Sequence, residues 1–125
     1  MSEIVFSTER FAPGLPEECQ VNPNVLGFEL ACWLGPALAK DGFVTSYPHP
    51  EDWGWYLDYS REGKRFMIGC AGSRVEGEQR YEWRIFIEEA RSLFRPGKGA
   101  SAEAEAVMRA VLRCLEAEGV SAAFE

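Results

Sequence analysis

Two stretches of the chain carry apolar residues at three- and four-residue steps, the spacing of an amphipathic helix. The first runs from the start signal at 22–24 to the stop at 40–42, and its stripe is Leu26, Leu30, Trp33, Leu34, Ala37 and Leu38. The second begins after the N-cap candidate Ser101, ends at Gly119, and has the stripe Ala104, Val107, Met108, Val111, Leu112 and Leu115. Because the first stripe continues in phase across Pro36, we expect one bent helix there.

Between the helices, apolar and polar residues alternate, which is typical of strands with one buried face. The expected strands are 43–47, 53–59, 65–71 and 81–88, with short ones at 4–6 and 120–124. The order β-α-β-β-β-β-α, with room for a last strand, predicts a two-layer α+β domain. It has an antiparallel sheet of about five strands and two helices packed on one face. We expect one domain over residues 1–125, with a ferredoxin-like arrangement as the alternative.

The alternation also assigns aromatic rings to the two faces of the sheet. If Trp53, Trp55 and Tyr59 face the helices, then Tyr56 faces away from them. Tryptophan and tyrosine dominate protein interfaces, so partly exposed rings in this region indicate a contact surface. The pattern leaves open whether the aromatic cluster as a whole is core or surface. Its members are Tyr47, Trp53, Trp55, Tyr56, Tyr59 and Trp83.

The chain of 125 residues has 20 acidic and 13 basic residues and a formal charge of −7. Affinity for nucleic acids rests on clustered lysine and arginine, so this balance argues against nucleic-acid binding. It suits a basic protein partner, because complementary charge speeds encounter, although charge also simply keeps a small protein dissolved. The sequence shows neither a signal-like segment nor a long apolar run, so we expect a cytoplasmic protein without membrane contact.

Four cysteines stand far apart, at positions 19, 32, 70 and 114, without a C-x-x-C pair. This spacing does not support a zinc site. We therefore expect small buried side chains with free thiols, and no bound metal or cofactor.

The segment 47–55 contains the only histidine of the chain, His49, beside Glu51 and Asp52. A histidine next to carboxylates is a candidate acid–base group, but no nucleophile or orienting partner can be assigned to it, and an exposed loop is the plainer reading. A second candidate is the loop before the second helix, where Arg95, Lys98 and Ser101 have the composition of an anion site. That loop lacks the Walker order, so a solvated connection is favoured.

Together these patterns predict a protein that binds another macromolecule and is not an enzyme. The expected partner-binding residues are Tyr47, His49, Glu51, Asp52, Trp53 and Tyr56. In size, acidity and helix–meander–helix layout, the chain resembles the small α+β immunity proteins that bacteria carry against their own toxins. This resemblance covers no motif, so it transfers no functional residue. The alternative is a small-ligand protein or minor enzyme with a pocket near His49 and the 91–101 loop. Both a monomer and a homodimer remain open.

Overall fold

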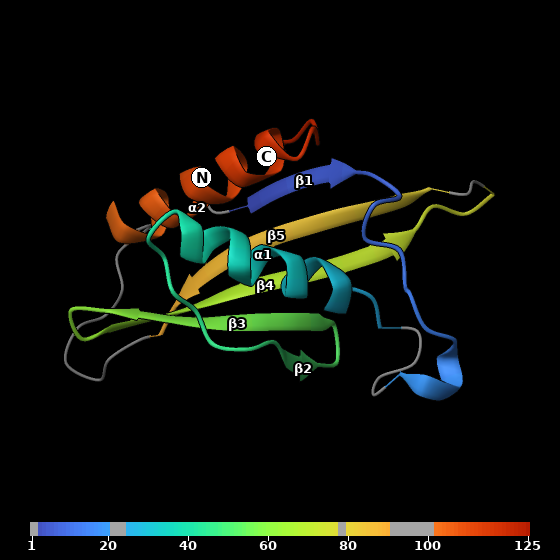
Figure 1. Cartoon of the computed structure of the whole chain (residues 1–125), viewed down its shortest axis with the longest axis horizontal. Coiled ribbons are helices and arrows are strands. Elements are labelled where there is room, and N and C mark those ends of the chain that lie inside the picture. Colours follow the sequence, from blue (N-terminus) through green and yellow to red (C-terminus); the bar gives the residue numbers. More distant parts are fainter. Residues whose placement is uncertain (1–2, 21–24, 78–79, 91–101) are drawn as a thin grey trace.

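The computed structural model describes residues 3–20, 25–77, 80–90 and 102–125, and these form an α+β domain (Figure 1). Strands β1 Glu3–Ser7, β2 His49–Glu51, β3 Gly54–Arg61, β4 Lys64–Arg74, β5 Tyr81–Glu89 and β6 Ala123–Phe124 make one sheet. Every pairing is antiparallel, and the strand order is β2-β3-β4-β5-β1-β6. The helices are α1 Phe28–Lys40 and α2 Ala102–Ala117, and a short 3₁₀ helix covers Glu17–Cys19. The predicted fold class and element order are confirmed.

Both helices pack on the same face of the sheet, α1 over β3 and β4, and α2 over β5 and β1 (Figure 1). The predicted stripes supply the helix side of the core, because Leu30, Leu34 and Leu38 of α1 are fully buried, as are Val107 and Leu115 of α2. The sheet side of the core comes from alternate strand residues, including Ile4, Leu57, Ile68, Trp83 and Ile85. Two one-sided layers therefore close around a single apolar core.

Helix α1 begins later than the sequence indicates. The start signal at 22–24 lies outside the described residues, and the helix itself begins at Phe28. Leu26 forms an isolated bridge to Gly72 of β4, so the chain is still attached to the sheet two residues before the helix. Pro36 lies within the helix, as expected, and α1 runs from Phe28 to Lys40 as one element.

Glycines with positive φ shape the turn between β3 and β4 and the end of α2. Glu62 and Gly63, with φ of 51° and 77°, form the two-residue turn between β3 and β4, which matches the right-handed twist of the strands. At the end of α2, Gly119 has φ of 80°. The amide of Val120 donates to the carbonyl of Leu115, and the amide of Gly119 to that of Glu116, which completes a glycine-terminated helix.

The strand expected at 43–47 is absent, and β2 consists instead of His49–Glu51. The segment 43–48 approaches β3 only locally, through Ser46, whose amide donates to the Asp58 carbonyl at 2.9 Å. Proline normally stops a strand, but Pro50 lies in β2, which is at the edge of the sheet. There the missing N–H of Pro50 leaves no partner strand unpaired.

The cysteine prediction is only partly correct. All four thiols are free, but Cys70 alone is buried, whereas Cys19 and Cys32 are exposed and Cys114 is half-buried. Burial in the core, where no polar group compensates a thiolate, raises the pKa of Cys70 far above its ordinary value, and the nearby Cys32 raises it further.

Candidate functional site

The face of the sheet opposite the helices carries a row of aromatic side chains. His49, Tyr56, Gly69 and Phe86 lie directly opposite one another on β2, β3, β4 and β5, so their side chains share this open face. The rings of His49 and Tyr56 are stacked, with centroids 5.1 Å apart and planes at 25°. No described helix covers this side of the sheet (Figure 1).

Trp53 extends the row from the turn between β2 and β3. Its ring lies 5.1 Å from that of Phe86, centroid to centroid, although β3 and β5 are separated by β4. Gly69 makes this contact possible: a Cβ there would lie 2.3 Å from the Phe86 ring, so that ring rests directly on the glycine backbone. We call His49, Trp53, Tyr56 and Phe86 the aromatic row.

The structure brings together three of the predicted partner-binding residues, His49, Trp53 and Tyr56, in the aromatic row. Glu51 pairs with Gly54 on the same face, and Asp52 is exposed in the adjoining turn. Tyr47 is 91% exposed and makes none of the ring contacts found among the described residues.

The condition that Trp53, Trp55 and Tyr59 all face the helices does not hold, because Trp53 lies against Phe86 on the open face. The alternation that buries Trp55 and Tyr59 ends at Gly54, and Trp53 belongs to the turn, where strand alternation no longer decides direction. Tyr56 faces away from the helices, as predicted. The aromatic cluster is thus divided, with Trp55, Tyr59 and Trp83 in the core and Trp53 and Tyr56 on the open face.

The carboxylate that approaches His49 is Asp58, rather than its sequence neighbours Glu51 and Asp52. Nε2 of His49 lies 3.5 Å from Oδ2 of Asp58, and both side chains are nearly half exposed. Within the described part of the chain, no hydrogen bond joins His49 to a serine, threonine or cysteine. The pair therefore has the geometry of a solvated surface contact and lacks the nucleophile of a catalytic triad.

Acidic side chains outnumber basic ones on the open face. By their strand register, the carboxylates on this face are Glu3, Glu51, Asp58, Glu82 and Glu88, and the arginines are Arg65 and Arg84. Arg84 is neutralised by Glu3 at 2.7 Å, whereas Glu51, Glu82 and Glu88 form no ion pair with another described residue. The aromatic row therefore lies within a negative field.

Sequence reasoning missed Phe86 and Asp58 as members of this surface. The signal was present, because Phe86 alternates with Trp83, Ile85 and Ile87, and that alternation places it on the far face of β5. The sequence does not show strand order, and only the order β2-β3-β4-β5 brings Phe86 to Trp53.

The remaining sequence candidates do not add to this surface. Arg95, Lys98 and Ser101 lie outside the described residues, so their anion site stays a prediction. In the part of the chain that the structure describes, no group of three His, Cys, Asp or Glu side chains is arranged to hold a metal ion. The helices among these residues are too short or too polar to cross a membrane.

No protein-family model, curated protein or solved structure matches this chain. The functional argument therefore rests on the geometry of its own residues.

Gly69 provides a test of the aromatic row. We expect Gly69→Ala to lower the free energy of unfolding by about 1 kcal/mol, because the new methyl group displaces the Phe86 ring. In a Phe86→Ala background the same change should instead stabilise the protein, by about 0.5–1 kcal/mol, because alanine suits a strand better than glycine. Urea unfolding of the four proteins of this double-mutant cycle measures the coupling. Additive effects would contradict the placement of the ring on Gly69.

Proposed function

We propose that the chain is a non-enzymatic protein-binding domain whose open sheet face binds a basic protein. The observation that carries the proposal is the aromatic row, an array of rings on a sheet face that no described helix covers. Trp53 is 39% exposed, and Tyr56 and Phe86 are half-buried. Such partly exposed tryptophan and tyrosine side chains supply most of the energy at protein interfaces.

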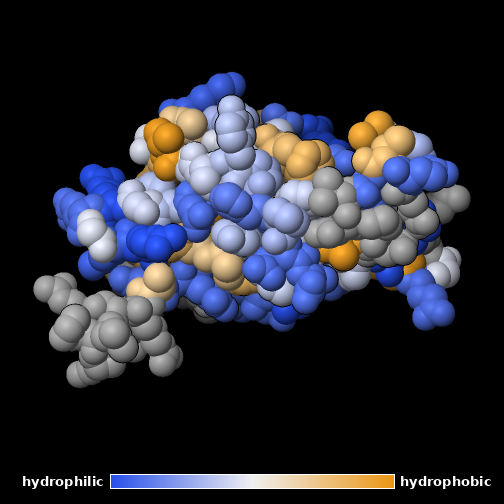
Figure 2. Space-filling model, turned by 90° about the horizontal axis from the view of Figure 1, so that it is seen from below, coloured by the Kyte–Doolittle hydropathy of each residue, from blue (hydrophilic) through white to orange (hydrophobic). Residues whose placement is uncertain are grey.

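Charge supports a basic partner in particular. The net charge of −7, together with Glu51, Glu82 and Glu88, which no described cation neutralises, gives the open face a potential that attracts positive proteins and repels nucleic acid. Seen from below, toward the β2 edge of the sheet, the surface is largely hydrophilic, and its hydrophobic residues lie in small separate patches (Figure 2). This polar character argues against a broad self-association surface along that edge. An immunity or inhibitor role in the cytoplasm is one specific form of the proposal.

The alternative, a pocket near His49 and the 91–101 loop, has less support. His49 stacks on Tyr56 on the open face, and the loop lies outside the described residues. The chemistry around His49 is that of a contact surface, with one neighbouring carboxylate, Asp58.

Affinity capture tests the proposed surface. We expect the wild-type protein to retain a stoichiometric basic protein from a bacterial lysate, and we expect Tyr56→Ala to weaken binding of the purified partner about 30-fold, as for an interface hot spot worth about 2 kcal/mol. Val44→Ala is the matched control, because Val44 is 72% exposed and is not part of the sheet. Binding should weaken as salt is raised.

Two results would contradict the proposal. One is a partner that binds Tyr56→Ala and Trp53→Ala as tightly as wild type, since both residues belong to the aromatic row. The other is an acidic partner with salt-independent affinity. Thermal unfolding of each variant establishes that lost binding does not come from lost structure.

A further inference from the structure

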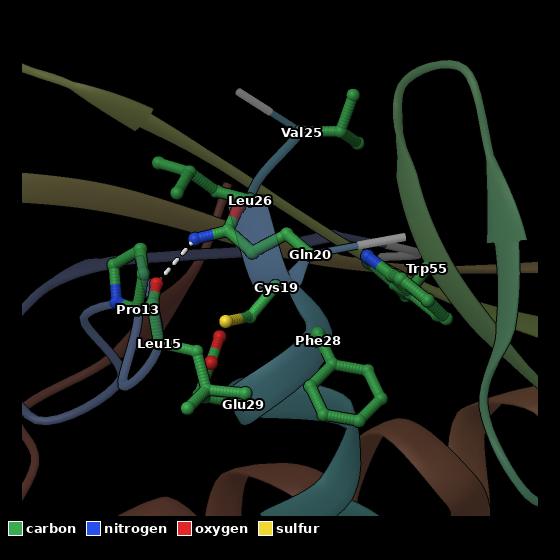
Figure 3. A pocket seen from close by; sticks show the side chains of 9 residues that line it. All are labelled: Pro13, Leu15, Cys19, Gln20, Val25, Leu26, Phe28, Glu29 and Trp55. Carbon is green, nitrogen blue, oxygen red and sulfur yellow. Dashed lines mark hydrogen bonds between the residues drawn. The ribbon is translucent and has the colours of Figure 1, made fainter. Parts of the chain in front are cut away.

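A small cavity lies at the N-terminal end of α1, on the opposite side of the sheet from the aromatic row. Its volume is about 150 Å³, and its walls come from the segment before α1, the first turn of α1 and β3 (Figure 3). Leu15, Leu26, Phe28 and Trp55 are among its apolar lining residues. An engineered cavity of about this volume in another protein holds benzene, so the space fits a ligand of one ring.

Trp55 brings an unsatisfied hydrogen-bond donor to this cavity. The side chain is only 7% exposed, and among the described residues its Nε1 is the buried side-chain nitrogen or oxygen that lacks a hydrogen-bond partner. The indole nitrogen is on the cavity side of the ring, directed toward Gln20 (Figure 3). Leaving a buried donor unpaired costs about 1–3 kcal/mol, and buried tryptophan usually finds an acceptor. The core tryptophan Trp83 does so, by donating to the Thr8 carbonyl at 2.9 Å.

The rest of the wall favours an uncharged acceptor. The N-cap of α1 is Gly27, which offers no side-chain acceptor to the first turn, so the amides there add to the donors near the cavity. Glu29 also lines the cavity, where its carboxylate accepts from the Gly14 amide at 3.1 Å. Among the lining residues that the structure describes there is no lysine or arginine. A carboxylate ligand would therefore meet a like charge without a compensating cation.

From this geometry we propose that the α1 cavity binds a small uncharged molecule with an aromatic or apolar body and a carbonyl-type acceptor. The acceptor receives a hydrogen bond from the Trp55 N–H. Less than 1 Å² of Nε1 is accessible, so the ligand reaches it by displacing a side chain at the wall. Gln20, toward which the indole nitrogen is directed, is the wall side chain suited to this movement, because its amide is held by a hydrogen bond to the Leu15 carbonyl of the same exposed segment (Figure 3).

Titration with acetophenone, a neutral aromatic ketone, tests this site. In ¹H–¹⁵N spectra of the full chain, we expect the Trp55 indole resonance to shift and saturate at millimolar ketone, while the Trp53 indole resonance stays in place. Trp55→Phe keeps an aromatic ring but removes the donor, and should weaken acetophenone binding about five- to tenfold, the value of one hydrogen bond. Trp53→Phe is the matched control and should bind as the wild type does.

Ethylbenzene and benzoate separate the parts of the proposal. Ethylbenzene lacks the acceptor, so it should bind the wild type more weakly than acetophenone does. Ethylbenzene should bind Trp55→Phe and the wild type with equal affinity. Benzoate, which is anionic, should bind most weakly. Equal affinity for ethylbenzene and acetophenone, tighter binding of benzoate, or an unmoved Trp55 resonance would each overturn the proposal. If Trp55→Phe does not fold, Leu15→Glu replaces it, because Leu15 is 59% exposed and a charge in the wall should abolish binding. None of these results depends on the open face.

Discussion

Replacing Gly27 with alanine should lower the free energy of unfolding by about 2–5 kcal/mol, through backbone strain and a steric clash together. Gly27 has φ of 126°, a conformation that side chains with a Cβ rarely adopt. A Cβ at this position would also lie 2.4 Å from the carbonyl oxygen of Cys70. That oxygen belongs to the backbone of β4, in the interior of the sheet, and cannot move aside as a side chain can. Urea unfolding at constant pH measures the loss.

Two glycines separate the causes of this effect. Gly119→Ala introduces the strain alone, because Gly119 has φ of 80° but open space around it, and should cost about 1–2 kcal/mol. Gly14→Ala introduces neither, since a Cβ on Gly14 would have nothing within 4 Å of it, and should stay within about 0.5 kcal/mol of wild type. A Gly27→Ala protein that is no less stable than Gly119→Ala would show that α1 does not begin against β4.

The start of α1, at Gly27, is a feature that the sequence did not predict. The helical stripe identified the buried side of α1 correctly through Leu30, Leu34 and Leu38. Leu26 has the spacing of the helical stripe, so periodicity assigned it to the helix. In the structure Leu26 instead forms a bridge with β4. The start of a helix depends on local capping and tertiary contacts, which a period of 3.6 residues does not encode.

The open face was likewise predicted only in part. Alternation placed Tyr56 outside and Trp55 inside, because each lies within a regular strand. It failed at Trp53, in a turn, and at 43–47, where β-branched and aromatic residues favoured a strand that tertiary packing does not form. The contact between Trp53 and Phe86 needs the strand order and the missing side chain of Gly69. These are long-range properties, and a single sequence does not reveal them.

The α1 cavity was beyond prediction for a different reason. Its walls combine Leu15, Phe28 and Trp55, which come from separate segments. The alternation did place Trp55 in the core, but it says nothing of whether an indole N–H finds an acceptor. That property depends on the position of each neighbouring carbonyl, and so it appears only in the structure.

Cys70 should make the stability of this protein depend strongly on pH above the ordinary range of a thiol. In the unfolded chain the thiol ionises at about pH 8.5. In the folded state burial keeps it protonated to a much higher pH. A group whose pKa is raised on folding contributes stability that is complete below its unfolded pKa and is lost as pH rises above it. The loss approaches about 1.4 kcal/mol per pH unit.

Comparison of wild type with Cys70→Ala isolates this contribution, because the alanine variant lacks the titrating group. Between about pH 8 and pH 10.5, under reducing conditions, wild type should lose about 2 kcal/mol more stability in urea than Cys70→Ala does. Cys19→Ala is the matched control: its thiol is exposed in the folded state, so this variant should follow the wild-type curve. Tyr59, whose pKa is raised by burial and by its hydrogen bond to Glu103, titrates in both proteins and cancels in the difference. Parallel curves for wild type and Cys70→Ala would mean that water reaches the Cys70 thiol, and that the core between α1 and β4 is open there.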